Sequence, residues 1–280
     1  MFMSLEKDLK RKIDEYTRQI KANPNYAEAY YNRGNAYGRL REYTLAIQDF
    51  DKVIELKPNF DRAYNNRGNA YYDLRQFDRA IADFDQAIEL NPNDANYYVN
   101  RGTIYHHVKH YELAIQDFSK VIELVPNFDK AYNKRGNAYF NLRQFEFAIQ
   151  NFNKAIELNP NDANYYVNRG TAYHYIKQFE LAIQDYSKVI ELYPNSALAY
   201  KNRGWSYYCL RKYQSAIKDC DKAIALNPNY SEAYNNRGCA YYGDGQTEKA
   251  RRDFEKAYEL NPNNTQAKKN IEVCRKSLGK

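Results

Sequence analysis

The chain has 280 residues, of which 44% are hydrophobic, with 30 tyrosines, a net charge of +7 and a mean hydropathy of −0.90. No apolar run approaches the roughly 18 residues that span a bilayer, and the first residues lack the apolar stretch of a secretory signal. Six of the seven excess positive charges lie in residues 1–26 and 265–280. Residues 27–264 are therefore almost neutral, which weakens the electrostatic argument for nucleic-acid binding, while the lack of a long apolar run weighs against a membrane protein.

Residues 1–26 are expected to form an N-terminal capping helix. Apolar residues fall on one stripe at helical spacing, with charged residues elsewhere; the stripe comprises Leu5, Leu9, Ile13, Tyr16 and Ile20. A tandem array needs such a helix, because the apolar face of its first repeat would otherwise meet water.

The eight prolines of the chain lie 34 residues apart. They are Pro24, Pro58, Pro92, Pro126, Pro160, Pro194, Pro228 and Pro262. This spacing predicts a tandem array, because each proline ends a helix at the same place in a repeating unit. The seven expected repeats are 27–60, 61–94, 95–128, 129–162, 163–196, 197–230 and 231–264.

Each repeat is expected to be a pair of helices. In residues 61–94, apolar positions recur at helical spacing from Ala63 to Leu74 and again from Phe77 to Leu90, with a short connection between them. A glycine within each first helix and an alanine within each second helix indicate that the two helices approach closely. Helix N-caps are expected at Asn93, Asp94, Ser196 and Ser231.

An arginine at the seventh place of every repeat has an aspartate 16 residues later in six of the seven repeats. Arg67 and Asp83 are one such pair, and Asn151 is the exception opposite Arg135. We expect an arginine–carboxylate pair within each helix pair, which would satisfy a half-buried guanidinium.

Residues 265–280 are expected to form a C-terminal solvating helix with one apolar stripe, namely Ala267, Ile271, Cys274 and Leu278. The four cysteines have neither metal-ligand nor disulfide-framework spacing, so we expect free thiols in a reducing, cytoplasmic location.

The repeat resembles the tetratricopeptide repeat (TPR). In residues 61–94 the family positions are occupied by Tyr64, Gly68, Tyr71, Ala80, Phe84 and Pro92. The general pattern has leucine where Arg67 stands, and this Asn-Arg-Gly variant resembles a large subgroup of the family. The resemblance implies an all-α, right-handed superhelical α-solenoid of seven helix-turn-helix repeats with terminal capping helices. It also implies a non-catalytic scaffold or adaptor that binds protein partners.

In the family, the first helix of each repeat lines a concave groove. We define the groove face as the second, fifth, sixth, ninth, twelfth and thirteenth places of each repeat. Amides and aromatic rings dominate these places and are expected to bind an extended or helical peptide. The candidate residues are Tyr31, Asn32, Asn35, Asn66, Asn69, Tyr72, Asn100, His106, Lys134, Asn137, Phe140, Asn168, His174, Tyr175, Lys201, Asn202, Trp205, Tyr208, Asn236 and Tyr242.

Two interpretations of the asparagine amides remain open. They could bind a peptide, or they could bond to one another across adjacent helices. The lysines at 134 and 201 suggest a partner with an acidic side chain or a terminal carboxylate. The carboxylate clamp of chaperone-binding TPR proteins cannot be assembled, because no three successive repeats supply its basic positions.

Other functions are less well supported by the sequence. His106 and His110 have a metal-compatible i,i+4 spacing, but no adjoining glutamate completes an H-E-x-x-H motif, so neither a metal nor another cofactor is expected. No phosphate-binding glycine loop or nucleophile motif indicates an enzyme. Association of two or more copies, and single-stranded RNA binding by the aromatic residues of the groove, are the alternatives.

Overall fold

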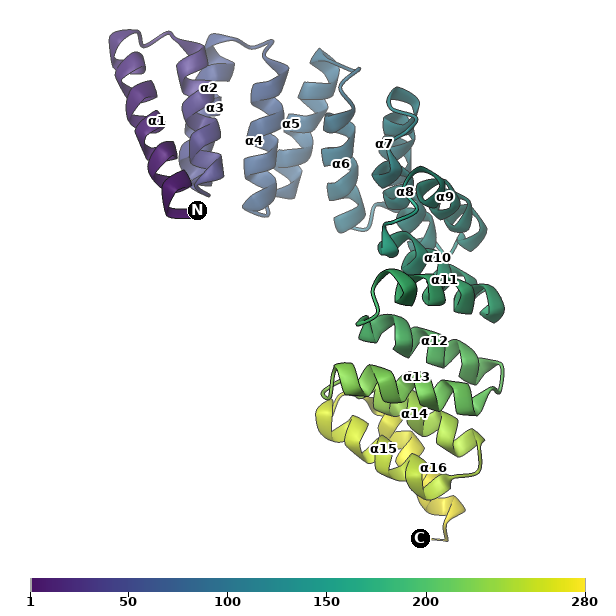
Figure 1. Ribbon diagram of the computed structural model, residues 1–280. Helices are drawn as coiled ribbons and strands as arrows, with labels where there is room; N and C mark the ends of the chain where they lie inside the picture. The colour runs from purple at the N-terminus through teal and green to yellow at the C-terminus, as the bar shows by residue number, and fades with distance from the viewer. Residues whose placement is uncertain (1, 280) are drawn as a thin grey trace. The chain divides into compact units, whose positions relative to one another are not determined.

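A computed structural model of the chain describes residues 2–279, with the side chains from Glu6 onward (Figure 1). These residues form sixteen α-helices and no strand. The helices are α1 (Phe2–Ala22), α2 (Ala27–Arg39), α3 (Tyr43–Leu56), α4 (Asp61–Asp73), α5 (Phe77–Leu90), α6 (Ala95–His107), α7 (Tyr111–Leu124), α8 (Asp129–Asn141), α9 (Phe145–Leu158), α10 (Ala163–Tyr175), α11 (Phe179–Leu192), α12 (Ala197–Cys209), α13 (Tyr213–Leu226), α14 (Ser231–Gly243), α15 (Thr247–Leu260) and α16 (Thr265–Ser277).

The helices form two compact units, Met1–Ala138 and Tyr139–Lys280, and the border lies within α8. Each unit is a stack of consecutive helix pairs. In the N-terminal unit α2 pairs with α3, α4 with α5 and α6 with α7, and in the C-terminal unit α10 pairs with α11, α12 with α13 and α14 with α15. The expected all-α array of helix pairs is therefore confirmed. None of the described helices is long and apolar enough to cross a membrane.

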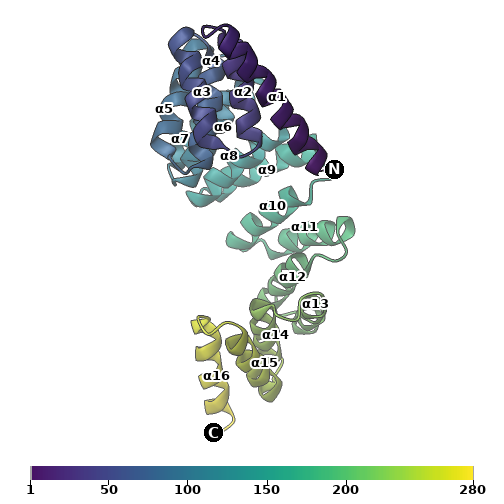
Figure 2. The same cartoon turned by 90° about the vertical axis from the view of Figure 1, so that its left-hand side faces the viewer.

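The ends of the two stacks are covered by single helices (Figure 2). Helix α1 contacts α2, and its Leu9 is buried; the side chain of Leu5 lies outside the described residues. Helix α16 contacts α15 and buries Ala267, Ile271 and Cys274. Both helices therefore turn apolar residues toward the stack, as a terminal helix of an array must.

Small residues set the spacing within each pair. A Cβ added to Gly34 would lie 2.9 Å from the Phe50 ring, and one added to Gly102 would lie 2.9 Å from Asp117 Cβ. Ala80 and its counterparts in the other second helices have no exposed surface. The close approach expected from the mid-helix glycines is therefore confirmed, and a larger residue would overpack the pair.

Two of the four expected N-caps form. Asp94 accepts a hydrogen bond from the Asn96 amide, and Ser196 accepts one from the Ala199 amide. The expectations for Asn93 and Ser231 were wrong. Asn93 precedes the capping residue, whereas Ser231 is the buried first residue of α14 and its hydroxyl donates to the carbonyl of Ala257.

The expected arginine–aspartate pairs are confirmed in the six repeats that carry the aspartate. Arg67 Nε donates to Asp83 Oδ2 at 2.9 Å and Arg67 Nη2 to Asp83 Oδ1 at 2.6 Å, a two-bond geometry that the other five repeats share. In the repeat with the exception, Asn151 donates to the carbonyl of Phe147. Burial raises the pKa of the Asp83 carboxyl, and the hydrogen bonds and charge of Arg67 oppose that shift.

The same arginines also reach backward, which the sequence analysis did not predict. Arg67 Nη1 donates to Asp51 on the second helix of the preceding repeat, at 2.6 Å. Every arginine of the series bonds to the residue 16 positions before it, and these acceptors are Thr17, Asp51, Asp85, Ser119, Asn153, Ser187 and Asp221. In the six repeats that carry the aspartate, the guanidinium therefore connects its own second helix to the helix that directly precedes its own first helix in the chain.

The two carboxylates around Arg67 provide a matched test. Asp83→Ala should destabilise the fold by about 3 kcal/mol or more, because it removes the buried partner and leaves the guanidinium half-buried. Asp51→Ala should cost at most about 1 kcal/mol, since the side chain of Asp51 is 51% exposed. Urea unfolding followed by circular dichroism measures both changes, and equal costs for the two variants would contradict the assignment.

Candidate functional site

The groove face is a continuous surface in each unit, because consecutive first helices contact each other. Helix α4 contacts α2 and α6 in the N-terminal unit, and α12 contacts α10 and α14 in the C-terminal unit. Of the candidate residues, Asn32, Tyr175 and Tyr242 are exposed and the other seventeen are half-buried. Within each unit the candidates therefore share one surface, to which each first helix contributes.

In the N-terminal unit the amides form a network of their own. Asn66 Nδ2 donates to Tyr31 Oη at 3.0 Å and to Asn35 Oδ1 at 2.8 Å. The chain of bonds continues through Asn65, which donates to Asn66 Oδ1 and accepts from Asn100 Nδ2. Part of the hydrogen-bonding capacity expected for a peptide is thus used between adjacent helices, which is the alternative that the sequence left open. Asn65 was missed, although its fifth-place position lies on the groove face.

Two lysines of the groove face are half-buried beside aromatic rings. Lys134 Nζ donates to Thr103 Oγ1 at 3.2 Å and lies 5.9 Å from the centre of the Phe118 ring. Lys201 Nζ lies 5.7 Å from the centre of the Tyr230 ring. Among the described residues neither ammonium group has an ion-pair partner within 4.0 Å. Burial lowers the pKa of both lysines, and Glu232 opposes this shift at Lys201.

A histidine lies near each of these lysines. His106 packs edge-on against Tyr111, and His174 packs against Phe179 while its Nδ1 lies 3.1 Å from Ser206 Oγ. Burial, followed by the charge of Lys134 and of Lys201 respectively, lowers the pKa of the two histidines. Both imidazoles are therefore held toward the neutral form.

Aromatic rings gather on the groove face of the C-terminal unit. Tyr175 stacks on Phe145 at 5.3 Å and meets Phe140 edge-on at 5.2 Å. On the next first helix, Trp205 stacks on Tyr208 at 4.8 Å between ring centres. Such clusters offer a large apolar contact area with few rotatable bonds, so a contact with them would cost little side-chain entropy.

A cavity of about 560 Å³ opens between these rings. Four candidates are among its lining residues, namely His174, Tyr175, Asn202 and Trp205, and α11 contributes Phe179 and Tyr186. Its size falls within the range of about 300–1,000 Å³ typical of ligand sites. It lies where α10 and α12 end, so a bound segment would contact both first helices.

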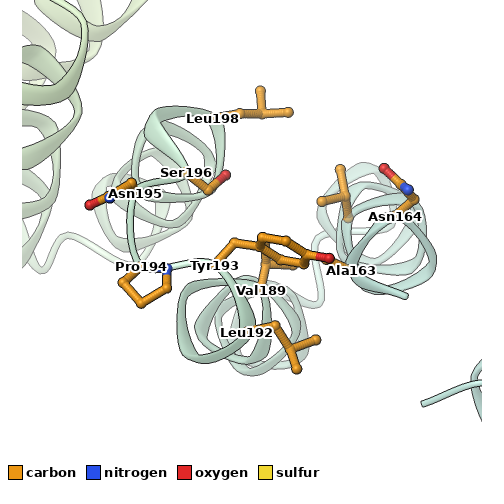
Figure 3. Close-up of a pocket in the computed structure, with 10 residues that line it drawn as sticks. Ala163, Asn164, Val189, Leu192, Tyr193, Pro194, Asn195, Ser196 and Leu198 are labelled. Carbon is orange, nitrogen blue, oxygen red and sulfur yellow. The ribbon is translucent and has the colours of Figure 1, made fainter. Parts of the chain in front are cut away.

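A second cavity, of about 600 Å³, lies at the opposite ends of the same two helices (Figure 3). Figure 3 shows the Tyr193 ring extending from the loop after α11 toward α10. Tyr193 is 58% exposed and Leu198 is 44% exposed. Neither residue was predicted from the sequence. A signal was available, because an aromatic residue, Tyr193, stands before the proline, where the other six repeats have four asparagines, one lysine and one valine.

Other candidates lie apart from these cavities. Asn32 is on α2 and Asn100 on α6, Tyr72 packs against Phe77, and Tyr242 Oη lies 3.2 Å from Ser277 Oγ on α16. Asn137, Asn168 and Asn236 are half-buried on α8, α10 and α14. The described residues contain no cluster of three or more His, Cys, Asp or Glu side chains that could hold a metal ion.

Comparison with protein families matches tetratricopeptide repeat models to residues 27–60, 61–94, 129–162, 163–196, 197–230 and 231–264, and to the overlapping segments 84–116 and 109–142. The chain belongs to the tetratricopeptide repeat family. No match was found among curated proteins.

Solved TPR structures resemble the chain over much of its length. YrrB, described as a TPR protein with an unusual peptide-binding site, is 27% identical; the alignment covers 66% of this chain and 95% of YrrB, with a TM-score of 0.59. MamA is also 27% identical, over 61% of this chain and 94% of MamA, with a TM-score of 0.56. The C-terminal part of a TPR protein from Cytophaga hutchinsonii is 24% identical over 86% of this chain and 99% of its own length, with a TM-score of 0.73, and supports the fold alone.

The environment of His174 in this TPR protein predicts its titration. Its pKa should lie below the ordinary value of 6.5, and Lys201→Met should raise it, because a neighbouring positive charge is removed. Lys177→Met, which changes an exposed lysine at the rim of the same cavity, should leave it unchanged. Titration of the imidazole signals by NMR measures these values.

The sign of the linked stability change follows from the lowered pKa. Below pH 6.5 the unfolded chain binds a proton at His174 more readily than the folded chain does. The contribution of His174 to stability is therefore complete above that pH and decreases as the pH falls toward the lower pKa of the folded state. A His174 pKa above 6.5 in the folded protein would contradict the assignment.

Proposed function

We propose that the chain is a non-catalytic scaffold or adaptor that binds a segment of a partner protein on its groove face. The observation that carries the proposal is the pair of cavities at the two ends of α10 and α12, one of them lined by the aromatic cluster. The similarity to YrrB, a TPR protein with a peptide-binding site, supports it.

The spacing of the two cavities favours an extended segment. Helix α10 has 13 residues and is therefore about 20 Å long. An extended chain advances about 3.3 Å per residue, so a stretch of about six residues would reach from one cavity to the other. Its apolar side chains would enter the two cavities. Asn168, which lies between them on α10, and Asn202, which lines one of them on α12, would face its backbone.

We also propose that residues 27–264 act as seven repeats, with residues 1–26 and 265–280 as terminal caps. The burial of Leu9 against the N-terminal unit and of Ile271 and Cys274 against the C-terminal unit supports this division. The caps would keep the groove face, rather than the ends of the stack, as the surface available to partners.

Removing two groove-face residues tests the binding site. The double variant Asn168→Ala, Trp205→Ala should lose partners that the wild-type chain retains in an affinity pull-down analysed by mass spectrometry. Phe147→Ala is the matched control, because Phe147 is a 52% exposed aromatic residue on the second helix α9. Partners retained equally by the double variant and the wild type would place the site elsewhere.

The half-buried Lys201, which has no ion-pair partner within 4.0 Å among the described residues, supports an acidic residue in the bound segment. Lys201→Met should weaken binding of the captured segment by about tenfold, because an ion pair in a partly buried site is lost. The same substitution should have no effect on a segment whose acidic residues are replaced by their amides. Isothermal titration calorimetry with the two peptides measures the difference, and equal losses for both would refute the role of the carboxylate.

A further inference from the structure

Ring pairs recur at one place in five consecutive repeats. The side chain at the twelfth place of the repeat packs against the ring at the seventeenth place, which begins the second helix. The five pairs are Tyr72–Phe77, His106–Tyr111, Phe140–Phe145, His174–Phe179 and Tyr208–Tyr213, with ring centres 5.1–6.0 Å apart. The contact is therefore a regular part of the array.

The first repeat has only half of this pair. Tyr43 stands at the seventeenth place, but the twelfth place is Gly38. The next repeat does not supply a ring either. At the thirteenth place of two later repeats, His107 and Tyr175 pack against the seventeenth-place ring of the repeat before, Phe77 and Phe145 respectively. The thirteenth place of the second repeat is Asp73, which has no ring.

Neither packing nor backbone geometry requires a glycine at position 38. A Cβ added there meets no atom within 4 Å, and the φ angle of Gly38 is not positive. Gly34, one turn earlier, differs in this respect, because the Phe50 ring leaves no room for a Cβ. The absence of a side chain at position 38 therefore creates space.

That space is a cavity of about 360 Å³ in the N-terminal unit. Phe50, Ala70 and Tyr43 give it an apolar lining, and its polar lining includes the amides of Asn35, Asn66 and Asn69 and the charged groups of Arg39 and Asp73. Among the described residues, the side chains of Asn69 and Arg39 form no hydrogen bond or ion pair. Tyr43 and Asp73 line the same cavity; burial, followed by the charge of Asp73, raises the pKa of the Tyr43 hydroxyl.

We propose that this cavity binds a tyrosine side chain of a partner protein, whose ring takes the place left empty by Gly38. The ring would pack against Tyr43, as Tyr72 packs against Phe77. Its hydroxyl would meet the polar side of the cavity, where Asn69 and Arg39 can donate and Asp73 can accept. The inference rests on the proposed function in that it assigns a second contact, in the N-terminal unit, to a partner protein that binds the groove face.

The test uses N-acetyl-L-tyrosinamide as a probe of the full-length, ¹⁵N-labelled chain. Its addition should shift the amide signals of Gly38 and the side-chain amide signals of Asn69, with saturation at high probe concentration. N-acetyl-L-leucinamide and N-acetyl-L-argininamide should bind about tenfold more weakly or worse. The arginine probe matters because its guanidinium could pair with Asp73, and equal or tighter binding of that probe would overturn the proposal.

Gly38→Tyr should abolish the shifts at Asn69, because the variant recreates the ring pair and fills the cavity. Gly38→Ala is the matched control and should retain binding, since the added methyl group meets no neighbour. If Gly38→Tyr does not fold, Tyr43→Thr serves instead and should weaken the probe about tenfold; the seventh repeat carries Thr247 at that place. Unchanged binding by the folded Gly38→Tyr variant would refute the site.

The tests of this inference and of the proposed function are independent. The probe is read in the N-terminal unit, whereas Asn168 and Trp205 lie in the C-terminal unit, so either test can fail while the other succeeds. Light scattering against concentration, for the wild type and Gly38→Tyr, tests whether a ring from a second copy fills the cavity. Self-association that Gly38→Tyr abolishes would overturn the partner-segment proposal.

Discussion

The array depends on the hydrogen bonds of the arginine guanidinium at the seventh place of each repeat. In six repeats it makes two hydrogen bonds to the aspartate of its own second helix, and in all seven it bonds to the helix that directly precedes its own in the chain. Because the guanidinium is planar and always charged, it fixes the separation of these helices more narrowly than apolar packing alone would. The seventh place is not among the six places that form the groove face, so the groove-face residues can change while the stack is maintained.

Against this constant frame, the repeats differ in the side chains that they place on the groove face. The C-terminal unit concentrates exposed and half-buried rings, with a cavity at each end of α10 and α12. The N-terminal unit instead uses its asparagines to connect α2, α4 and α6 and leaves one ring position empty. Amides that are bonded to one another hold the helices together but have less capacity for a ligand. The rings and cavities are therefore better suited to the proposed binding than the amide series is.

The sequence predicted the fold because its signals repeat. Each proline, each mid-helix glycine and each arginine–aspartate offset occurs often enough to define a helix pair, and the structure confirms these contacts. The sequence predicted the site less well. The spacing of the asparagines does not say whether their amides face a ligand or an adjacent helix. Asn65 shows why, because its bonds to Asn66 and Asn100 depend on side-chain geometry. The cavity beside Tyr193 forms only where α10, the end of α11 and α12 meet, which spacing along the chain does not show. The missing ring at Gly38 is recognised only by comparison with the ring pairs of the other repeats.

Photo-crosslinking from two matched positions tests most directly whether partners bind on the groove face. The photoreactive residue p-benzoyl-L-phenylalanine would replace Tyr175, which is 56% exposed on the first helix α10, or Phe147, which is 52% exposed on the second helix α9. Similar exposure makes the two positions comparable in access to solvent. We predict that a partner protein crosslinks from position 175 and not from position 147. Crosslinking of the same partner from position 147 alone would contradict the groove-face account.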